Sequence, residues 1–167
     1  IEIEPIMTPP AEQPNTVRMA TAACQTLNED TGSPTDLQIE NCPVAIRSGK
    51  SQPGADRSSY RAYLNANDVL RYYEGAHGRR SYDGKGSELV SLVHVGKNFA
   101  NAFWNSDGGF MAYGDGDGVV MTDLTRSLDV AGHEMTHGVT SQTARLIYMD
   151  ESGALNEAFS DFFGVVI

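Results

Sequence analysis

The sequence predicts an α+β fold in which a β-rich N-terminal lobe leads into two helices near the C-terminal end. Three patterns support this prediction. Residues 1–57 contain short apolar patches between Thr, Pro, Asn, Asp and Ser, which is typical of short strands and turns. Apolar residues at helical spacing begin at Tyr60. Further strand patterns then precede two C-terminal segments with helical periodicity.

The first helix is expected from Tyr60, after a loop over residues 48–59 that is rich in Ser, Gly and Pro. Gly75 and Gly78 are expected to end it, because glycine readily adopts the left-handed conformation found after a helix C-terminus. Its apolar residues at helical spacing are Ala62, Ala66, Val69, Leu70 and Tyr73.

Strands are predicted at two places beyond this helix. Residues 88–95 alternate between polar and apolar side chains, and residues 101–118 carry two strands joined through residues 106–109. The Asp-Gly repeat at residues 115–118 resembles a calcium loop, but Arg126 stands where an EF-hand has its glutamate. A hairpin turn is therefore favoured there.

Two helices complete the chain, one predicted over residues 128–143 and one beginning near Ser152 or Gly153. Residues 1–150 would then form the β-rich lobe, and residues 151–167 the first helix of a further, helical lobe. The last helical pattern has neither a cap nor a glycine exit. We therefore expect the polypeptide to continue, either in the gene or in a partner chain.

Composition narrows the classes of partner. The chain has 167 residues, enough for a sizeable core, and 22 acidic against 12 basic residues give a net charge of −10. This balance argues against nucleic acid, whose phosphates need a basic surface. No apolar run approaches the roughly 18 residues that would cross a bilayer, so no membrane partner is expected.

The strongest chemical signal is the segment H-E-M-T-H, which carries His133, Glu134 and His137. Positions four apart lie on one face of a helix, so both histidines can point at one metal ion. Glu134 is rotated by about 100° and can lie beside the ion as a general base without ligating it. The alternative is an amphipathic helix with two surface histidines.

A catalytic zinc ion needs a third protein ligand and a position left open for water. The next helix offers Asn156, Glu157 and Asp161. Glu157 and Asp161 are again four apart, so one carboxylate can ligate while the other accepts a hydrogen bond from a ligating imidazole. Two histidines, one glutamate and an open position form a hydrolytic zinc site.

The segments D-V-A-G-H-E-M-T-H-G-V-T and R-L-I-Y-M-D-E-S-G-A-L-N-E-A-F-S-D-F-F-G resemble the thermolysin family of zinc metalloendopeptidases. In that family 19 residues separate the H-E-x-x-H motif from the glutamate ligand, and residues 138–156 supply 19 here. The segments A-H-G-R-R-S-Y-D-G-K-G, F-A-N-A-F-W-N and Y-G-D-G-D-G resemble family segments in the same order. The resemblance extends from Tyr60 to Ile167, whereas residues 1–57 depart from it.

The resemblance implies a role for each matching residue. Zinc would be bound by His133, His137 and Glu157. Glu134 would act as the general base, and Tyr148 would donate a hydrogen bond to the developing oxyanion. The family's second lobe supplies further groups for the transition state. This chain is therefore expected to be inactive or weakly active alone.

Supporting positions follow from the same resemblance. Asp161 would orient His133, and Asn156 would support His137. Asn101 and Ala102 would hold the substrate main chain by strand addition. An apolar substrate pocket would be lined by Met121, Leu124 and Val130, for which core packing is the alternative.

Asp129 stands where the family has a calcium ligand, although an acidic residue also stabilises a helix N-terminus. Ca²⁺ is thus expected, if anywhere, in the complete enzyme. The two cysteines, Cys24 and Cys42, are either separate thiols or a disulfide across a polar, turn-rich segment. The resemblance implies a secreted protein, which favours the disulfide.

Two functions follow as hypotheses. The first is the catalytic lobe of a zinc metalloendopeptidase, which hydrolyses peptide bonds of peptide or protein substrates with metal-activated water. The second is a non-catalytic zinc-binding lobe that acts as an interaction or dimerisation module. Its surface would be the apolar residues of the last helix, namely Phe159, Phe162, Phe163 and Val166.

Overall fold

The computed structural model describes residues 17–21, 25–27, 34–37, 44–47, 50–51 and 55–167. Most of its strands form one six-stranded sheet in the order β5-β4-β1-β6-β8-β7, and β2 pairs only with β3. The strands are β1 (Val17–Thr21), β2 (Gln25–Leu27), β3 (Pro34–Leu37), β4 (Val44–Arg47), β5 (Lys50–Ser51), β6 (Leu89–Val93), β7 (Ala102–Asn105) and β8 (Phe110–Tyr113). The helices are α1 (Arg57–His77), α2 (Leu128–Gln142) and α3 (Asp150–Val166), with a 3₁₀ turn, η3 (Leu124–Arg126). The α+β fold class is thus confirmed.

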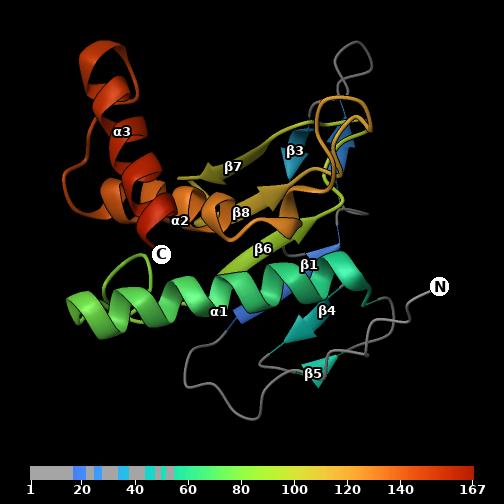
Figure 1. Ribbon diagram of the computed structural model, residues 1–167, viewed down its shortest axis with the longest axis horizontal. Helices are drawn as coiled ribbons and strands as arrows, with labels where there is room; N and C mark the ends of the chain where they lie inside the picture. The colour runs from blue at the N-terminus through green and yellow to red at the C-terminus, as the bar shows by residue number, and fades with distance from the viewer. Residues whose placement is uncertain (1–16, 22–24, 28–33, 38–43, 48–49, 52–54) are drawn as a thin grey trace.

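Two apolar cores lie against the sheet. Leu89 and Val93 of β6 belong to the larger core, which includes residues of α1 and α2, and Val90 and Leu92 belong to a second core with Phe110. Successive residues of a strand point to opposite faces, so these cores cover the two faces of the sheet. Figure 1 shows α1 running beside the sheet and α3 at one end of the molecule, next to α2.

Strand β6 differs from the half-buried strand that its alternating sequence predicts. All five of its residues are buried. The reason is its place in the sheet, since β6 pairs in parallel with β1 on one side and with β8 on the other. Parallel central strands are covered on both faces, so alternation in sequence does not become alternation in burial.

Helix α1 starts earlier than the predicted Tyr60, and of the two glycines predicted to end it only Gly78 does so. It begins at Arg57 because the Asp56 carboxylate caps it, accepting a hydrogen bond from the Ser59 amide at 2.9 Å. The chain passes through Gly75 as helix and stops only before Gly78, whose φ of 61° lies in the left-handed region. The loop predicted over residues 48–59 is therefore wrong where it overlaps β5, at Lys50–Ser51, and the first turn of α1.

The hairpin of β7 and β8 is confirmed, with residues 106–109 between antiparallel strands. Strand β7 is the last in the sheet order. The hairpin turn predicted at residues 115–118 is wrong, because residues 119–167 are all described and contain no strand. The Asp117 carboxylate instead accepts hydrogen bonds from three successive amides, those of Val119, Val120 and Met121.

The two C-terminal helices nearly match their predicted bounds. Helix α2 ends one residue earlier than expected, at Gln142, and α3 begins two or three residues earlier, at Asp150. Asp150 and Glu151 occupy the first turn of α3, where acidic side chains favour the helix dipole. The Tyr73 hydroxyl and Thr136 Oγ1 lie 2.6 Å apart and join α1 to α2 inside the larger core.

In the part of the chain that the structure describes, no helix is both long and apolar enough to span a bilayer. Cys24 and Cys42 lie outside the described residues.

Candidate metal centre

The structure brings three metal-binding side chains together at the contact of α2 and α3. The Nε2 atoms of His133 and His137 are 3.0 Å apart, as their i, i+4 spacing on α2 predicts. Glu157 reaches them from α3, with Oε2 3.2 Å from His133 Nε2 and Oε1 3.6 Å from His137 Nε2. The ligand atoms of all three residues lie within 4.8 Å of one another.

Hydrogen bonds at Nδ1 hold both imidazole rings in orientation. His133 Nδ1 lies 2.9 Å from Asp161 Oδ1, and His137 Nδ1 lies 2.8 Å from Asn156 Oδ1. Ser160 Oγ is also 3.1 Å from His137 Nδ1, a contact that sequence reasoning missed. Ser160 lies one helical turn after Asn156, so helix periodicity could have found it.

This arrangement fits a cation. Each Nδ1 faces a hydrogen-bond acceptor and therefore carries the proton, which leaves a lone pair on each Nε2. Two Nε2 lone pairs and a carboxylate repel one another at these distances, and a positive ion between them would remove the repulsion. Two nitrogen ligands of a tetrahedral zinc ion, each about 2.0–2.1 Å from it, are roughly 3.3 Å apart, close to the spacing of the two Nε2 atoms.

The pKa of His137 favours the neutral imidazole that a metal ion requires. Burial lowers the pKa of His137, and although the hydrogen bond to Asn156 acts in the opposite direction, the net shift is downward. The ring therefore remains neutral to lower pH than a free imidazole, and neutral imidazole is the form that binds a metal ion.

Glu134 follows His133 in α2 and is not one of the three residues whose ligand atoms converge. It is only 7% exposed. Burial, followed by the negative charge of Glu157, raises the pKa of Glu134 to about 7, although the backbone N–H of Trp104 on β7 donates a hydrogen bond that lowers it. A carboxylate with this pKa can accept and release a proton near neutral pH.

Tyr148 lies in the segment between α2 and α3. Its hydroxyl donates a hydrogen bond to Glu157 Oε1, and the side chain is 67% exposed. This hydrogen bond, together with burial of the hydroxyl, raises the pKa of Tyr148 to about 12. The hydroxyl is therefore a proton donor throughout the physiological range, at the edge of the cluster.

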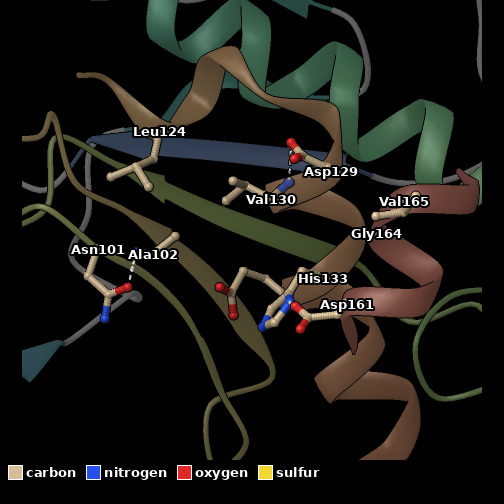
Figure 2. Close-up of a pocket in the computed structure, with 10 residues that line it drawn as sticks. Asn101, Ala102, Leu124, Asp129, Val130, His133, Asp161, Gly164 and Val165 are labelled. Atoms are coloured by element: carbon tan, nitrogen blue, oxygen red, sulfur yellow. Dashed lines mark hydrogen bonds and ion pairs between the residues drawn. The ribbon is translucent and has the colours of Figure 1, made fainter. Parts of the chain in front are cut away.

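Two pockets flank the cluster and share Asn101, Ala102, His133 and Glu134. The first has a volume of about 460 Å³ and continues to Leu124, Val130 and Asp161, as Figure 2 shows. The second has a volume of about 530 Å³ and continues to Trp104 and Tyr148. Both volumes lie in the range of ligand-binding pockets. The shared residues come from the start of β7 and from α2, so the two pockets adjoin each other beside the metal cluster.

The remaining candidate residues lie around the first pocket. Leu124 and Val130 line it and also pack, half-buried, against the larger core. Met121 lines neither pocket and is 46% exposed. Asp129 lines the first pocket from the first turn of α2, where its carboxylate accepts a hydrogen bond from the Val130 amide at 2.9 Å.

Comparison with known proteins identifies two family models in sequence order. Residues 12–141 match the thermolysin metallopeptidase catalytic domain, and residues 144–167 match the thermolysin metallopeptidase alpha-helical domain. The catalytic-domain match begins well before Tyr60, so the resemblance covers more of the N-terminal region than the sequence segments predicted.

Individual relatives agree with the family models. The chain is 48% identical over 112 residues to a thermolysin of Alicyclobacillus acidocaldarius subsp. acidocaldarius, covering 67% of this chain and 20% of that protein. It is 51% identical over 110 residues to the neutral protease NprE of Bacillus pumilus, covering 66% of this chain and 36% of that protein. The chain spans about a fifth of the length of the first curated relatives that it matches.

A solved structure supports the fold. The precursor of protealysin, a metalloproteinase from Serratia proteamaculans, superimposes with a TM-score of 0.75 at 31% sequence identity. The superposition covers 95% of this chain and 45% of the precursor.

Proposed function

The chain belongs to the thermolysin family of metallopeptidases, and we propose that it is the catalytic part of a zinc metalloendopeptidase. The observation that carries this proposal is the convergence of His133, His137 and Glu157 beside the buried carboxylate of Glu134. Two imidazoles and one carboxylate suit zinc, and such sites leave a coordination position for substrate or water. Hydrolysis of peptide and protein substrates is proposed for the whole protein.

Within this proposal, His133, His137 and Glu157 hold the zinc ion. When bound, the ion supplies a Lewis acid that polarises the peptide carbonyl and lowers the pKa of water. Glu134 accepts the proton of the attacking water and passes it to the leaving amine. Its pKa of about 7 suits both transfers, because a group that titrates near the working pH can serve as base and then as acid.

The neighbours of the ligands have separate tasks. Asp161 and Asn156 keep the two imidazoles in the tautomer that presents Nε2 to the ion. Tyr148 donates to the oxyanion that forms on the carbonyl oxygen. To do so, the Tyr148 hydroxyl gives up its hydrogen bond to Glu157 and donates to the substrate instead. Tyr148 is 67% exposed, which leaves it room to move.

The substrate is proposed to bind as an additional strand. Strand β7 is the last of the described strands in the sheet order, so an extended peptide could pair with its outer edge at Asn101 and Ala102. The first pocket, with Leu124 and Val130, would take an apolar side chain after the scissile bond. Met121 is also proposed for this apolar pocket, although it lines neither of the two pockets described above.

Three further features belong to the whole protein in this proposal. Asp129 contributes to a Ca²⁺ site, for which one carboxylate is too few ligands by itself. The protein is secreted, and Cys24 forms a disulfide with Cys42, as an oxidising compartment favours. Residues 1–150 act as the β-rich lobe, with α3 as the first helix of the helical lobe.

A second candidate is a non-catalytic zinc-binding lobe that associates through α3. Exposed apolar residues follow one face of this helix at spacings of four, three and four, namely Leu155, Phe159, Phe162 and Val166. We call them the outer stripe of α3. Phe163 does not belong to it, because its ring is half-buried, 5.6 Å from the ring of Tyr73. A second copy or further helices could cover this stripe, and a monomeric mass at all concentrations would contradict self-association.

The test of the proposed function is cleavage of an end-blocked, quenched fluorescent peptide by the zinc-loaded chain beside Glu134→Gln. The variant retains the ligands, so both proteins should bind about one zinc ion, measured by metal analysis after gel filtration. We expect the variant to lose cleavage, with His133→Ala as the control that loses zinc. Equal cleavage by Glu134→Gln would contradict the base. Full zinc content without cleavage in either protein would place the missing transition-state groups in a second lobe, so that this chain is half of an enzyme.

A further inference from the structure

The face of α3 that contacts α2 consists of small and polar residues. The buried residues of α3 are Gly153, Asn156, Ser160 and Gly164, at spacings of three, four and four. Such spacings keep side chains on one face of a helix. The larger apolar residues of α3 lie elsewhere: Leu155, Phe159, Phe162 and Val166 form the outer stripe, and Phe163 packs against the larger core. The two helices can therefore approach closely along this face, and their separation depends on which small residues lie in the contact.

Gly164 leaves no room for a side chain on this face. A Cβ atom added at Gly164 would lie 2.8 Å from the carbonyl oxygen of Asp129, and 3.4 Å and 3.5 Å from the amide nitrogen and Cβ of His133. The first two of these are backbone atoms of α2, which cannot rotate away as a side chain can. Figure 2 shows Gly164 beside the turn of α2 that carries His133.

The same stretch of α3 carries the groups that reach the cluster. Asp161 precedes Gly164 by three residues and Glu157 precedes it by seven, so all three lie near one face of the helix. Asp161 and Glu157 both contact His133, at 2.9 Å and 3.2 Å. Any change in the approach of the helices at Gly164 therefore changes both distances.

We propose that Gly164 is a positioning residue for the metal cluster, because its missing side chain sets the distance between α3 and the His133 turn of α2. This inference rests on the proposed metal site. Carbon and oxygen atoms that are not bonded stay about 3.3 Å apart or more, so a methyl group at Gly164 would move the helices by roughly 0.5 Å. A functional site tolerates displacements of only about 0.5 Å.

The test is the zinc affinity of Gly164→Ala, measured by competition with a chromophoric chelator, together with the visible spectrum of the Co²⁺-loaded chain. Alanine favours helix more than glycine does, so helix propensity alone predicts no loss. Misplacement of Glu157 and Asp161 predicts an affinity lower by roughly 10- to 100-fold and a changed Co²⁺ spectrum, which reports ligand geometry.

Two controls separate positioning from a general effect on the fold. Gly75→Ala makes the same chemical change in α1, where an added Cβ meets no atom within 4 Å, and should leave the zinc affinity unchanged. Val95→Ala removes buried carbons from the second core, on the face of the sheet away from α1 and α2. It should lower the melting temperature and leave the affinity and the Co²⁺ spectrum unchanged.

The outcomes distinguish the two proposals. An unaltered chain that takes up no zinc would overturn the metal site and the role of Gly164 together. Unchanged affinity and spectrum in Gly164→Ala, or an equal loss in Val95→Ala, would overturn the positioning role alone. If circular dichroism shows Gly164→Ala to be unfolded, Gly132→Ala replaces it, since its Cβ would lie 3.1 Å from the Gly164 Cα. A smaller loss of affinity is then expected, and no loss would overturn the proposal.

Discussion

His94 lies between two carboxylates that are far from it in sequence. Its Nε2 is 2.7 Å from Asp56 Oδ2, and its Nδ1 is 2.8 Å from Asp115 Oδ1. Asp56 is the residue that caps α1, and Asp115 follows β8. Burial disfavours the charged ring, but Asp115 and Asp56 outweigh it, so that the pKa of His94 is raised above its ordinary value of 6.5. The imidazolium thus joins the start of α1 to the segment after β8.

We predict that His94→Gln destabilises the chain at pH 6 by about 1 kcal/mol and has little effect at pH 9. Exposed ion pairs contribute about 0.2–1 kcal/mol each, and solvent screens these two, because the side chains of His94, Asp56 and Asp115 are 34%, 46% and 51% exposed. A raised folded-state pKa gives stability that is complete below the unfolded pKa of about 6.5 and is lost as the pH rises through the folded value.

The assay is urea unfolding of both proteins at several values between pH 6 and pH 9, with a chelator present. The comparison is the difference in free energy of unfolding between the two proteins, in which groups common to both cancel. Asp56 has a lowered pKa, and its contribution is lost only in acid, outside this window. A difference of about 1 kcal/mol that does not change between pH 6 and pH 9 would refute the ion-pair account.

Three other predictions follow from particular contacts. Gly138→Ala should destabilise the fold by about 1–3 kcal/mol, because the added Cβ would lie 2.7 Å from the indole ring of Trp104. The fluorescence emission of Trp104, the only tryptophan, should shift as well, and unchanged emission would contradict this packing. Asp161→Asn should weaken zinc binding by roughly tenfold, the low end for residues that hydrogen-bond to a metal ligand, because the Asp161 side chain is 75% exposed. Competition with a chelator measures the zinc affinity, and an unchanged affinity would argue against a role of Asp161 in orienting His133. Thiol titration of the denatured, unreduced protein should find no free thiol, whereas two would exclude a bridge between Cys24 and Cys42.

The metal ligands could be predicted from sequence because their geometry is local. Helix periodicity alone places His133 and His137 on one face, one turn apart. The same periodicity on the next helix relates Glu157 to Asp161. The 19 residues between His137 and Glu157 match the spacing in the thermolysin family, and this resemblance connected the histidines of one helix with the glutamate of the next. The structure brings the three ligand atoms within 4.8 Å, which required only that α2 and α3 pack together.

Other features of the fold and of the site depend on contacts between distant segments, and no local pattern encodes them. Asp56 and Asp115 meet His94 across 38 and 21 residues of sequence. The burial of β6 depends on its two parallel neighbours, which its own alternating residues do not reveal. Gly164 looks like a helix-weakening residue in sequence, and only the structure shows the carbonyl oxygen of Asp129 that would meet a side chain there.

The raised pKa of Glu134 comes from the fold and not from the H-E-x-x-H motif alone. On an isolated helix in water, a glutamate next to two histidines would keep a pKa near the ordinary value for its side chain. Here the packing of α2 against β7 leaves it only 7% exposed, and the approach of α3 adds the charge of Glu157. Both effects raise the pKa of Glu134 to about 7, against the hydrogen bond from the Trp104 amide. The pentapeptide thus supplies the carboxylate, whereas an edge strand and a second helix supply the environment in which that carboxylate can act as a base at neutral pH.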